Sequence, residues 1–415
     1  MQNLQTQLQK THQAQKILEK IPHSLKVQIL LQMSCAIQEQ SSKILQANLL
    51  DLQNAKNSLS YAMLERLKLD EKKIHSMAYS IEQIALLPDP LNQKLANWKK
   101  DNGLEIHKVS VPIGVIGIIY ESRPNVTSDS ACLCFKSGNA CVLKGGKEAK
   151  NSNQAILEIL QEVLLSHQLP KECISMLVDD THEGVLQMIK QDQWIDLLIP
   201  RGGEGLIKFV TQHATIPILK HDKGVCHLYI HKDAPIEKSI QIAINAKTQR
   251  PSTCNSIETL LIHRDIAPTI LPPLHQAFVQ KNTILKADQK IQEILKIPLE
   301  LLTEEDFYTE YGDNVLNIAI VSSLEEAILH INTYGSKHSE AIVTQSKESA
   351  ETFLDSIDAA CVYVNASTRF SDGGEFGFGA EIGISTNKLH ARGPVGLEGL
   401  TTYKYKIYGS WQTRN

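Results

Sequence analysis

The sequence predicts an α/β protein with two α/β domains in tandem and a small additional β element. The 415 residues, 42% of them hydrophobic, exceed the length of one ordinary domain and can fill a large core. Short continuous apolar runs alternate with helical stretches in two successive series, which is typical of parallel strands covered on both faces. A hairpin pattern and an alternating C-terminal segment stand apart from both series and predict the β element.

The N-terminal region and the β element come first in this order. Residues 1–90 show apolar positions at helical spacing, as in "AQKILEKIPHSLKVQILLQMSCAIQEQ", and predict several amphipathic helices. In "LANWKKDNGLEIHKVSV", Asp-Asn-Gly lies between two alternating stretches and predicts a hairpin whose turn needs positive φ. Near the C-terminus, "YKYKIYG" predicts an edge strand. Because an exposed edge of this kind favours pairing, we expect a homo-oligomer, a dimer or a tetramer.

The two series of strands follow the hairpin. The first contains "VPIGVIGIIY", "ACVLKGG", "ISMLVDD" and "WIDLLIP", with helices such as "NSNQAILEILQEVLLSHQ" between them, and predicts a doubly wound parallel sheet. The second contains "CHLYIHKDA", "SIETLLIH", "VLNIAIVSS", "EAIVT" and "ACVYVNA". Cys254 lies near the start of the second series, so we expect its thiol close to any cleft between the two domains.

Charge and hydropathy exclude several classes of partner. Forty-six acidic and forty-two basic residues leave a net charge of -4 without a basic block, which argues against nucleic acid. The polar start "MQNLQTQLQKTHQAQK" has no apolar signal core, and "VPIGVIGIIY" is too short to span a bilayer. The eight cysteines lack the dense spacing of a disulfide framework. The sequence therefore predicts a cytoplasmic protein with reduced thiols and no membrane partner.

Two cysteine-containing segments are candidate metal sites. The first, "ACLCFKSGNACVLKGG", contains Cys132, Cys134 and Cys141 but no histidine. The second, "HDKGVCHLYIH", is the better candidate and offers His221, Cys226, His227 and His231. Alternation along a strand would send Cys226 and His227 to opposite faces, so core packing is the preferred interpretation of both and no metal is expected.

Two glycine-rich turns follow strands of the first series. In "WIDLLIPRGGEGLIKFV", Gly202, Gly203 and Gly205 let the backbone approach a ligand, and the first amides of the next helix favour an anion. In "CVLKGGKEA", Lys144 and Lys147 follow a strand end and could meet a phosphate. Each turn alone is also compatible with a plain tight turn or a solvated lysine, because the full dinucleotide fingerprint is absent. Together they favour a dinucleotide.

Cys254 lies in "NAKTQRPSTCNSIETLLIH", after a proline and just before an apolar run. By burial tendency alone it would be an inert core residue. Its neighbours Arg250 and Asn255 and the small hydroxyl residues instead form a polar setting in which a thiolate can be stabilised and reached. Lys247 and Arg250 could stabilise that thiolate or hold an anionic substrate.

Long segments resemble the γ-glutamyl phosphate reductases of the aldehyde dehydrogenase superfamily. They are "VPIGVIGIIYESRPNVTSDSACLCFKSGNACVLKGG", "IDLLIPRGGEGLI", "NAKTQRPSTCNSIETLL", "HINTYGSKHSEAIVT" and "RFSDGGEFGFGAEIGISTNKLHARGPVGLEGLTTYKY", within a match from about residue 5 to 410. The resemblance implies an aldehyde dehydrogenase-like fold with a Rossmann-like cofactor domain and a catalytic domain. We expect a helical part of the cofactor domain at 1–98, an oligomerisation hairpin at 99–112, its Rossmann-like part at 113–222, the catalytic domain at 223–370, a segment lining the substrate site at 371–390 and an oligomerisation tail strand at 391–415.

The resemblance implies a reaction as well as a fold. It makes Cys254 the nucleophile of an NADP-dependent, phosphorylating glutamate-5-semialdehyde dehydrogenase in proline biosynthesis. NADPH would reduce L-glutamyl 5-phosphate to L-glutamate 5-semialdehyde, with release of phosphate, through a thioester on Cys254. Asn125 in "SRPNVT" stands where the superfamily places an oxyanion donor, with the backbone amide of Cys254 as the second donor. The alternative for Asn125 is a turn residue after Pro124.

The resemblance also places ligand-binding residues. Lys144 would lie near the adenosine ribose and favour NADPH, and Gly202 and Gly203 would flank the pyrophosphate. Glu310 in "YTEYGDN" matches a glutamate that binds the nicotinamide ribose, although the motif is altered and an exposed loop carboxylate is the alternative. The cations available to an acidic substrate are Arg123, Lys247, Arg250 and Arg369.

Two other functions were weighed against the reductase. A hydrolytic NAD(P)-dependent aldehyde dehydrogenase would need a water-activating glutamate, which "LKHDKGVCH" lacks; no role is assigned to His221 and Asp222 there. A thiol hydrolase or a nucleotide-binding module would leave the C-terminal motifs unexplained. The reductase reading also implies a separate glutamate kinase chain that supplies the unstable acyl phosphate, because the match leaves no room here for a kinase domain.

Overall fold

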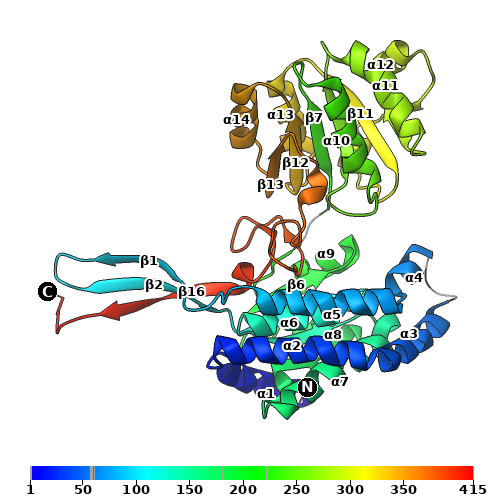
Figure 1. Ribbon diagram of the computed structural model, residues 1–415. Coiled ribbons are helices and arrows are strands. Elements are labelled where there is room, and N and C mark those ends of the chain that lie inside the picture. The colour runs from blue at the N-terminus through cyan, green and yellow to red at the C-terminus, as the bar shows by residue number, and fades with distance from the viewer. Residues whose placement is uncertain (1, 57–58, 60, 180, 221–222, 415) are drawn as a thin grey trace. The chain divides into compact units, whose positions relative to one another are not determined.

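The computed structural model of the protein describes residues 2–56, 59, 61–179, 181–220 and 223–414. The chain divides into two compact units. The first comprises Met1–His221, Gly377–Gly383 and Leu389–Asn415, and the second Asp222–Phe376 and Ile384–Lys388. Each unit contains a parallel sheet with helices packed on it, so the predicted pair of α/β domains is confirmed (Figure 1).

The parallel sheet of the first unit has the strand order β5-β4-β3-β6. Its strands are β3 (Val115–Tyr120), β4 (Ala140–Lys144), β5 (Ile174–Met176) and β6 (Leu197–Arg201). The chain runs outward from β3 through β4 to β5 and then returns to β6 on the other side of β3. In sheets of this kind, ligands bind outside the carboxyl ends of the strands at such a reversal. The ends of β3 and β6 are therefore the expected ligand edge.

Helices form the rest of this unit, including the N-terminal region where the sequence predicts them. They are α1 (Gln2–Leu18), α2 (His23–Glu39), α3 (Ser41–Ala55), α4 (Tyr61–Leu67), α5 (Glu71–Leu86), α6 (Asn125–Lys136), α7 (Lys150–Ser166), α8 (His182–Met188) and α9 (Glu204–His213). Figure 1 shows α2 and α5 side by side, and their apolar residues join those of α6, α7 and the sheet in one core. Asp70 caps α5 by accepting a hydrogen bond from the backbone N–H of Lys73.

The predicted hairpin and tail strand form a separate antiparallel sheet. Its order is β1 (Lys94–Lys99), β2 (Glu105–Pro112) and β16 (Thr401–Tyr408), so β16 is an edge strand, as expected. Gly103 takes a φ of 90° in the turn, which suits a residue without a Cβ. The hairpin begins at Lys94, one residue before the alternating stretch expected from Leu95, so the domain boundary expected at residue 99 falls at the end of β1.

The sheet of the second unit has the order β10-β9-β11-β8-β7-β12-β13, with parallel pairing. Its strands are β7 (Cys226–Ile230), β8 (Ile257–His263), β9 (Ile284–Ala287), β10 (Glu300–Leu301), β11 (Val315–Val321), β12 (Ser339–Val343) and β13 (Cys361–Val364). Its helices are α10 (Ile236–Thr248), α11 (Ala267–Val279), α12 (Gln289–Leu295), α13 (Leu324–Tyr334) and α14 (Lys347–Ser356). All residues of β7 and β8 are buried, as expected for strands covered on both faces. The short strands β14 (Ile384–Ser385) and β15 (Gly393–Pro394) lie in the segment that follows.

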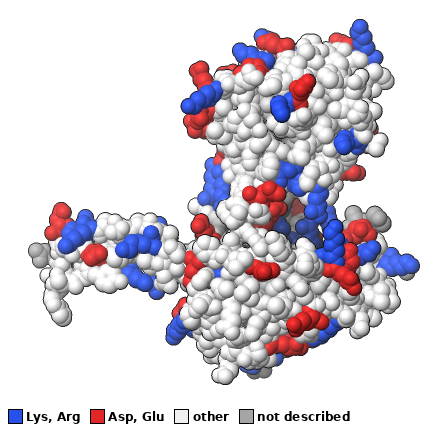
Figure 2. Space-filling view, in the orientation of Figure 1, with Lys and Arg blue, Asp and Glu red and all other residues white. Residues whose placement is uncertain are grey.

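The surface carries no dominant charge on the side that Figure 2 shows. Acidic and basic residues are interspersed over each unit there, in keeping with the small net charge of -4. Across the described ranges of the chain, no helix has the length and apolar character needed to cross a membrane.

Candidate active site

Cys254 lies in the short loop between α10 and β8 and is partly exposed. Every other described cysteine except Cys35 is buried. Cys35 lies on α2, in the first unit. The exposure of Cys254 argues against an inert core residue and leaves its thiol accessible to a substrate.

Hydrogen bonds fix the peptide on either side of Cys254. The Thr253 hydroxyl donates to the Arg250 carbonyl at 2.8 Å, and the Thr368 hydroxyl donates to the Asn255 carbonyl at 2.6 Å. The Asn255 side chain donates to the Ser371 carbonyl at 2.9 Å. The loop that carries the thiol is thus tied to the segment around residues 367–371, and the position of the sulfur is set by two segments distant in sequence.

Two residues to which the sequence analysis gave no part in this site, Cys226 and Gly224, contact the peptide of Cys254. The Cys226 thiol, at the start of β7, donates to the Cys254 carbonyl at 3.1 Å. Gly224 packs against the same peptide, and a Cβ on it would lie 2.0 Å from the Cys254 carbonyl oxygen and 2.4 Å from its Cα. Only glycine fits there. A lone glycine just before a buried strand in "HDKGVCH" is the signal that sequence offers for it.

Arg369 interacts electrostatically with Cys254 and with Arg250, which precedes Cys254 by four residues in the same loop. The Arg369 Nε donates to the Gln249 side-chain oxygen at 2.7 Å, and the Ser367 hydroxyl accepts from the Arg369 backbone N–H at 3.3 Å. Burial and the like charge of Arg250 lower the pKa of Arg369, and the negative charge of a Cys254 thiolate opposes them. The structure therefore brings these two predicted substrate cations together with the predicted nucleophile.

Lys247 is placed differently from the expectation that it holds substrate. Its side chain is fully buried, and its Nζ lies 2.7 Å from Glu258 Oε2 inside the second unit. Burial raises the pKa of Glu258 to about 8 against the opposing charge of Lys247, and burial lowers the pKa of Lys247. The last turn of α10 directs Lys247 toward β8, so its ammonium serves an internal ion pair. Arg123, Arg250 and Arg369 remain the candidate cations for an acidic ligand.

Glu310 lies in the loop before β11 and is partly buried. Its charge contributes to the raised pKa of Glu258, behind burial as the main cause, so the Glu310 loop lies near the Lys247–Glu258 pair. Gly312 in the same loop takes a φ of 60°, and a Cβ there would meet open space. His221 and Asp222, to which the sequence assigns no role, lie outside the described residues.

In the first unit, the glycine turn after β6 lies at the ligand edge of the sheet. The Gly203 backbone N–H donates to Glu121 Oε2 at 2.9 Å, and Glu121 directly follows β3. A Cβ on Gly202 would lie 2.7 Å from the Glu121 carboxyl carbon. Gly203 is also the N-cap of α9. The predicted pyrophosphate turn thus lies where β3 and β6 end, and its Gly203 N–H already binds a carboxylate there, that of Glu121.

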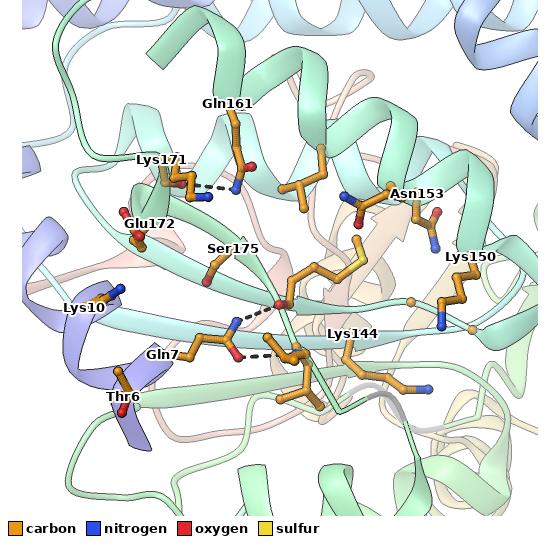
Figure 3. Close-up of a pocket in the computed structure, with 17 residues that line it drawn as sticks. Thr6, Gln7, Lys10, Lys144, Lys150, Asn153, Gln161, Lys171, Glu172 and Ser175 are labelled. Carbon is orange, nitrogen blue, oxygen red and sulfur yellow. Dashed lines mark hydrogen bonds between the residues drawn. The ribbon is translucent and has the colours of Figure 1, made fainter. Parts of the chain in front are cut away.

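Lys144 lines a pocket of about 430 Å³ in the first unit. The volume is within the range of small-molecule sites. Figure 3 shows Lys144 and Lys150 on one side of the pocket and Lys10 and Lys171 on the other. The Gln7 side chain of α1 closes one wall by donating to the Met176 carbonyl at 2.6 Å. Lysines supply most of the charge in this pocket, which suits an anionic ligand.

Glu148 is the acidic residue in the turn after β4, and it lies within electrostatic range of Lys144. The backbone N–H and the hydroxyl of Ser122 donate to Glu148 Oε1 at 2.7 and 2.6 Å. Burial acts to raise the pKa of Glu148, but these hydrogen bonds prevail and lower it, so the carboxylate is ionised and occupied.

Asn125 and Arg123 flank Pro124 at the start of α6, and both side chains are exposed. The Asn125 amide nitrogen donates to Asp129 Oδ2 at 3.1 Å, one turn further along the helix. This bond holds the amide nitrogen toward Asp129. Burial outweighs the hydrogen bonds from Asn125 and Ser80 and the charge of Arg201, and raises the pKa of Asp129 to about 6.

The raised pKa of Asp129 gives a pH-dependent prediction. The unfolded carboxyl titrates near 3.8 and the folded one near 6, so the folded state binds the proton more tightly. This contribution to stability is complete below the unfolded value and is lost as the pH rises through the folded value. We expect Asp129→Asn to gain about 1–3 kcal/mol of stability relative to wild type between about pH 4 and pH 7. Denaturant unfolding at both pH values checks this, and equal pH dependence in the two proteins would contradict it.

The other cysteines weighed for a metal site lie in the core. Cys132, Cys134 and Cys141 are buried, and burial raises the pKa of Cys132 and Cys134, so these thiols stay protonated. His227 pairs with Glu340 at 3.0 Å inside the second unit. Within the described part of the chain, no group of three His, Cys, Asp or Glu residues is arranged to hold a metal ion.

Comparison with known proteins relates this geometry to a family. Residues 2–293 match the family model described as "Aldehyde dehydrogenase family". A γ-glutamyl phosphate reductase from Sulfurimonas denitrificans is 58% identical over 408 residues, which cover 98% of this chain and 99% of that protein. The crystal structure of a γ-glutamyl phosphate reductase from Thermotoga maritima is 41% identical, with a TM-score of 0.96 and coverage of 99% of this chain and 100% of that one.

A more distant structure shares the fold alone. The acetylating aldehyde dehydrogenase from Geobacillus thermoglucosidasius is 21% identical with a TM-score of 0.70, and the alignment covers 100% of this chain and 98% of that one. The predicted aldehyde dehydrogenase-like fold is therefore confirmed. On the family model and the full-length relatives together, the chain belongs to the aldehyde dehydrogenase family and, within it, to the γ-glutamyl phosphate reductases.

Proposed function

We propose that the protein reduces L-glutamyl 5-phosphate to L-glutamate 5-semialdehyde with release of phosphate, as a step of proline biosynthesis in the cytoplasm. The observation that best supports this function is a partly exposed Cys254 near Arg250 and Arg369. The chain is also more than half identical to a full-length γ-glutamyl phosphate reductase. A thiol that acts on an acyl phosphate needs access to the acyl carbon and cations for the phosphate, and this loop supplies both.

The residues of the chain account for the steps as follows. The Cys254 thiolate attacks the acyl carbon, phosphate leaves, and a thioester to the sulfur remains. The Cys254 backbone N–H and the Asn125 amide are proposed to donate to the oxyanion that forms during this attack. A nicotinamide cofactor, when bound, supplies the hydride that brings the acyl group to the aldehyde level. The thiolate is then expelled, and Arg250 and Arg369 stabilise its negative charge.

Hydrolysis is the alternative fate of a thioester, and it needs a base that activates water. Glu258 is the carboxylate closest to Cys254 in sequence, and it is enclosed and bound to Lys247. It is therefore not available to a water molecule beside the sulfur. This placement supports transfer to and from phosphate over the hydrolytic aldehyde dehydrogenase.

Phosphate dependence tests the proposed function against that alternative. The reverse reaction, NADP reduction by glutamate 5-semialdehyde, is followed with and without inorganic phosphate. We expect strict dependence on phosphate, or on arsenate in its place. Turnover that persists after phosphate is removed would support the hydrolytic enzyme. Absence of any nicotinamide chemistry would support a thiol hydrolase or a nucleotide-binding module.

NADPH is proposed as the cofactor because of the charge around Lys144. The pocket there is lined by lysines, and the neighbouring Glu148 is bound to Ser122. Gly202 and Gly203 are proposed to flank the pyrophosphate, and Glu310 to bind the nicotinamide ribose. Lysine charge next to the adenosine ribose would favour a 2′-phosphate over a free hydroxyl.

We expect Lys144→Ala to raise the KM for NADPH about 10-fold while changing the KM for NADH less than about twofold. The reason is that the lost charge acts on the 2′-phosphate, which NADH lacks. Steady-state kinetics with each cofactor measure the effect. Lys190→Ala, at an exposed lysine outside the pocket, is the matched control. An equal rise for both cofactors would show that Lys144 does not distinguish them.

The β1–β2–β16 sheet is proposed to join subunits into at least a dimer. The ring of Tyr405 contacts Trp98 and Tyr403, with ring centroids 6.1 Å and 5.7 Å apart. All three are at least 41% exposed. Figure 2 shows uncharged surface between the scattered charged residues of this sheet. An aromatic face and an unpaired edge together favour a second copy of the sheet.

We expect Tyr405→Asp to shift the protein to monomers at micromolar concentration, because a charge would be buried in the aromatic contact. Sedimentation velocity measures the shift. Lys404→Ala is the control, since the side chain of the next residue in a strand points to the opposite face. A wild-type protein that sediments as a monomer would refute the proposed interface.

A separate glutamate kinase chain is proposed to supply the acyl phosphate.

A further inference from the structure

Gln249 connects the end of α10 to Arg369. It follows the last residue of the helix, and its backbone N–H donates to the Asn245 carbonyl at 3.3 Å. Its side-chain oxygen accepts from Arg369 Nε at 2.7 Å. On the other side of Cys254, the Asn255 side chain donates to the Arg369 carbonyl at 3.4 Å. Arg369 is thus held from both sides of the loop that carries the thiol, by its side chain and by its backbone.

The acceptor at position 249 is neutral, and this matters for the charge of Arg369. A carboxylate in its place would pair with the guanidinium and neutralise it. The amide oxygen of Gln249 instead fixes Nε and leaves the two Nη groups and the full positive charge for a ligand. Among the described residues, neither Arg250 nor Arg369 forms an ion pair with a carboxylate. Asp372, which faces Arg369 electrostatically, uses Oδ1 to accept from the Gly374 backbone N–H at 2.9 Å.

Two unpaired guanidinium groups near each other repel, so an anion between them is favourable. The proposed substrate offers two kinds of anion, a phosphoryl group and an α-carboxylate. Phosphorus is two covalent bonds from the carbon that the sulfur attacks, whereas the carboxylate carbon is four bonds from it. Cations fixed to the Cys254 loop therefore reach the phosphoryl group first. As the carbon–sulfur bond forms and the carbon–oxygen bond breaks, the electron pair leaves on a phosphate oxygen, where both cations stabilise it.

We propose that Arg250 and Arg369 form the site of the phosphoryl group, and that Gln249 is a positioning residue that holds the Arg369 guanidinium toward it. This inference rests on the proposed function and assigns one of its two anions to particular cations. The α-carboxylate then belongs to a different part of the protein. Gln249 needs no charge and no contact with substrate for this role.

The first test separates the two anions by kinetics of the full-length enzyme. NADP reduction is measured while phosphate and glutamate 5-semialdehyde are varied separately. We expect Gln249→Met, which keeps the length but removes the acceptor, to raise the KM for phosphate about 10-fold. The KM for the semialdehyde should change less than about twofold, because its carboxylate is bound elsewhere. Gln249→Glu keeps the acceptor but neutralises Arg369, so it should also raise the KM for phosphate.

The controls and contrary outcomes are specific. Gln280 stands directly after α11 as Gln249 does after α10 and is exposed, so Gln280→Met is the matched control and should leave both KM values unchanged. A variant that raises the KM for the semialdehyde and not that for phosphate would assign Arg369 to the α-carboxylate. No change in either KM would show that Gln249 does not position the cation. Equal losses for both substrates would indicate a merely structural role.

A second test needs no turnover. Alkylation of Cys254 by iodoacetamide is followed by mass analysis of its peptide, so that labelling of the exposed Cys35 does not interfere. Inorganic phosphate alone should slow alkylation of the wild type, and Gln249→Met should need about 10-fold more phosphate for the same protection. Glutamate, which offers carboxylates only, should protect less than phosphate. Equal protection by phosphate in both proteins would overturn the inference. If the wild type showed no phosphate-dependent NADP reduction, the proposed function itself would be refuted.

Discussion

Cys254→Ser is expected to abolish phosphate-dependent NADP reduction while leaving NADPH binding nearly unchanged. The hydroxyl of serine stays protonated at neutral pH and is a far weaker nucleophile than a thiolate, and no base in this loop is arranged to activate it. The cofactor residues proposed above, Lys144, Gly202 and Gly203, belong to the first unit, whereas Cys254 belongs to the second. Initial rates and equilibrium titration with NADPH measure the two effects separately.

Two further measurements sharpen this result. Cys35→Ser changes the other non-buried cysteine, on α2, and is expected to keep wild-type turnover. Incubation of the wild type with the acyl phosphate, cofactor withheld, should leave an acyl adduct on residue 254 that mass analysis detects. Near wild-type turnover by Cys254→Ser, or an adduct on another residue, would remove Cys254 as the nucleophile.

Gly224→Ala is expected to lower turnover at least about 100-fold, because it displaces the peptide of Cys254. The added Cβ would lie 2.0 Å from the Cys254 carbonyl oxygen, and a backbone atom cannot move aside as a flexible side chain can. Relief requires the Cys254 loop or β7 to shift by more than an ångström, which also removes the contact from Cys226. We expect a loss of stability of about 1–3 kcal/mol, seen in denaturant unfolding.

Gly205→Ala is the matched control for the stability measurement. A Cβ on Gly205 meets nothing within 4 Å, and the residue lies in the first turn of α9. Its unfolding free energy should be unchanged or slightly higher, since alanine is the better helix former. If Gly224→Ala kept full turnover and stability, the packing of Gly224 against Cys254 would not determine the position of the thiol.

The fold was largely predictable because short continuous apolar runs that alternate with helices are typical of parallel strands covered on both faces. The continuous apolar runs that predict β7, β8, β11 and β12 correspond to buried strands, and the Asn-Gly turn marks the hairpin. The domain boundary is harder to place, because every residue of β1 is exposed and burial does not mark where that strand belongs.

The candidate site was predictable where its reactive and charged residues are close together in sequence. Arg250 and Cys254 share one loop, and the motif that contains them points to a nucleophile. Lys247 also lies near them in sequence, but its side chain points inward to Glu258. Predicting this direction would require knowing how α10 packs on β8. Gly224 and Gln249 were missed for the same reason. Their partners, Cys254 and Arg369, become neighbours only in the folded chain.

The buried pair of Lys247 and Glu258 limits which amino-acid substitutions these two positions tolerate. Removing either partner alone leaves the other buried polar group without its partner, at a cost of up to about 3–5 kcal/mol, whereas exchanging both for apolar residues of similar volume is often tolerated. Mutational scanning that varies one position at a time would therefore record both sites as intolerant. Libraries that change the two codons jointly would find solutions that single substitutions never reach.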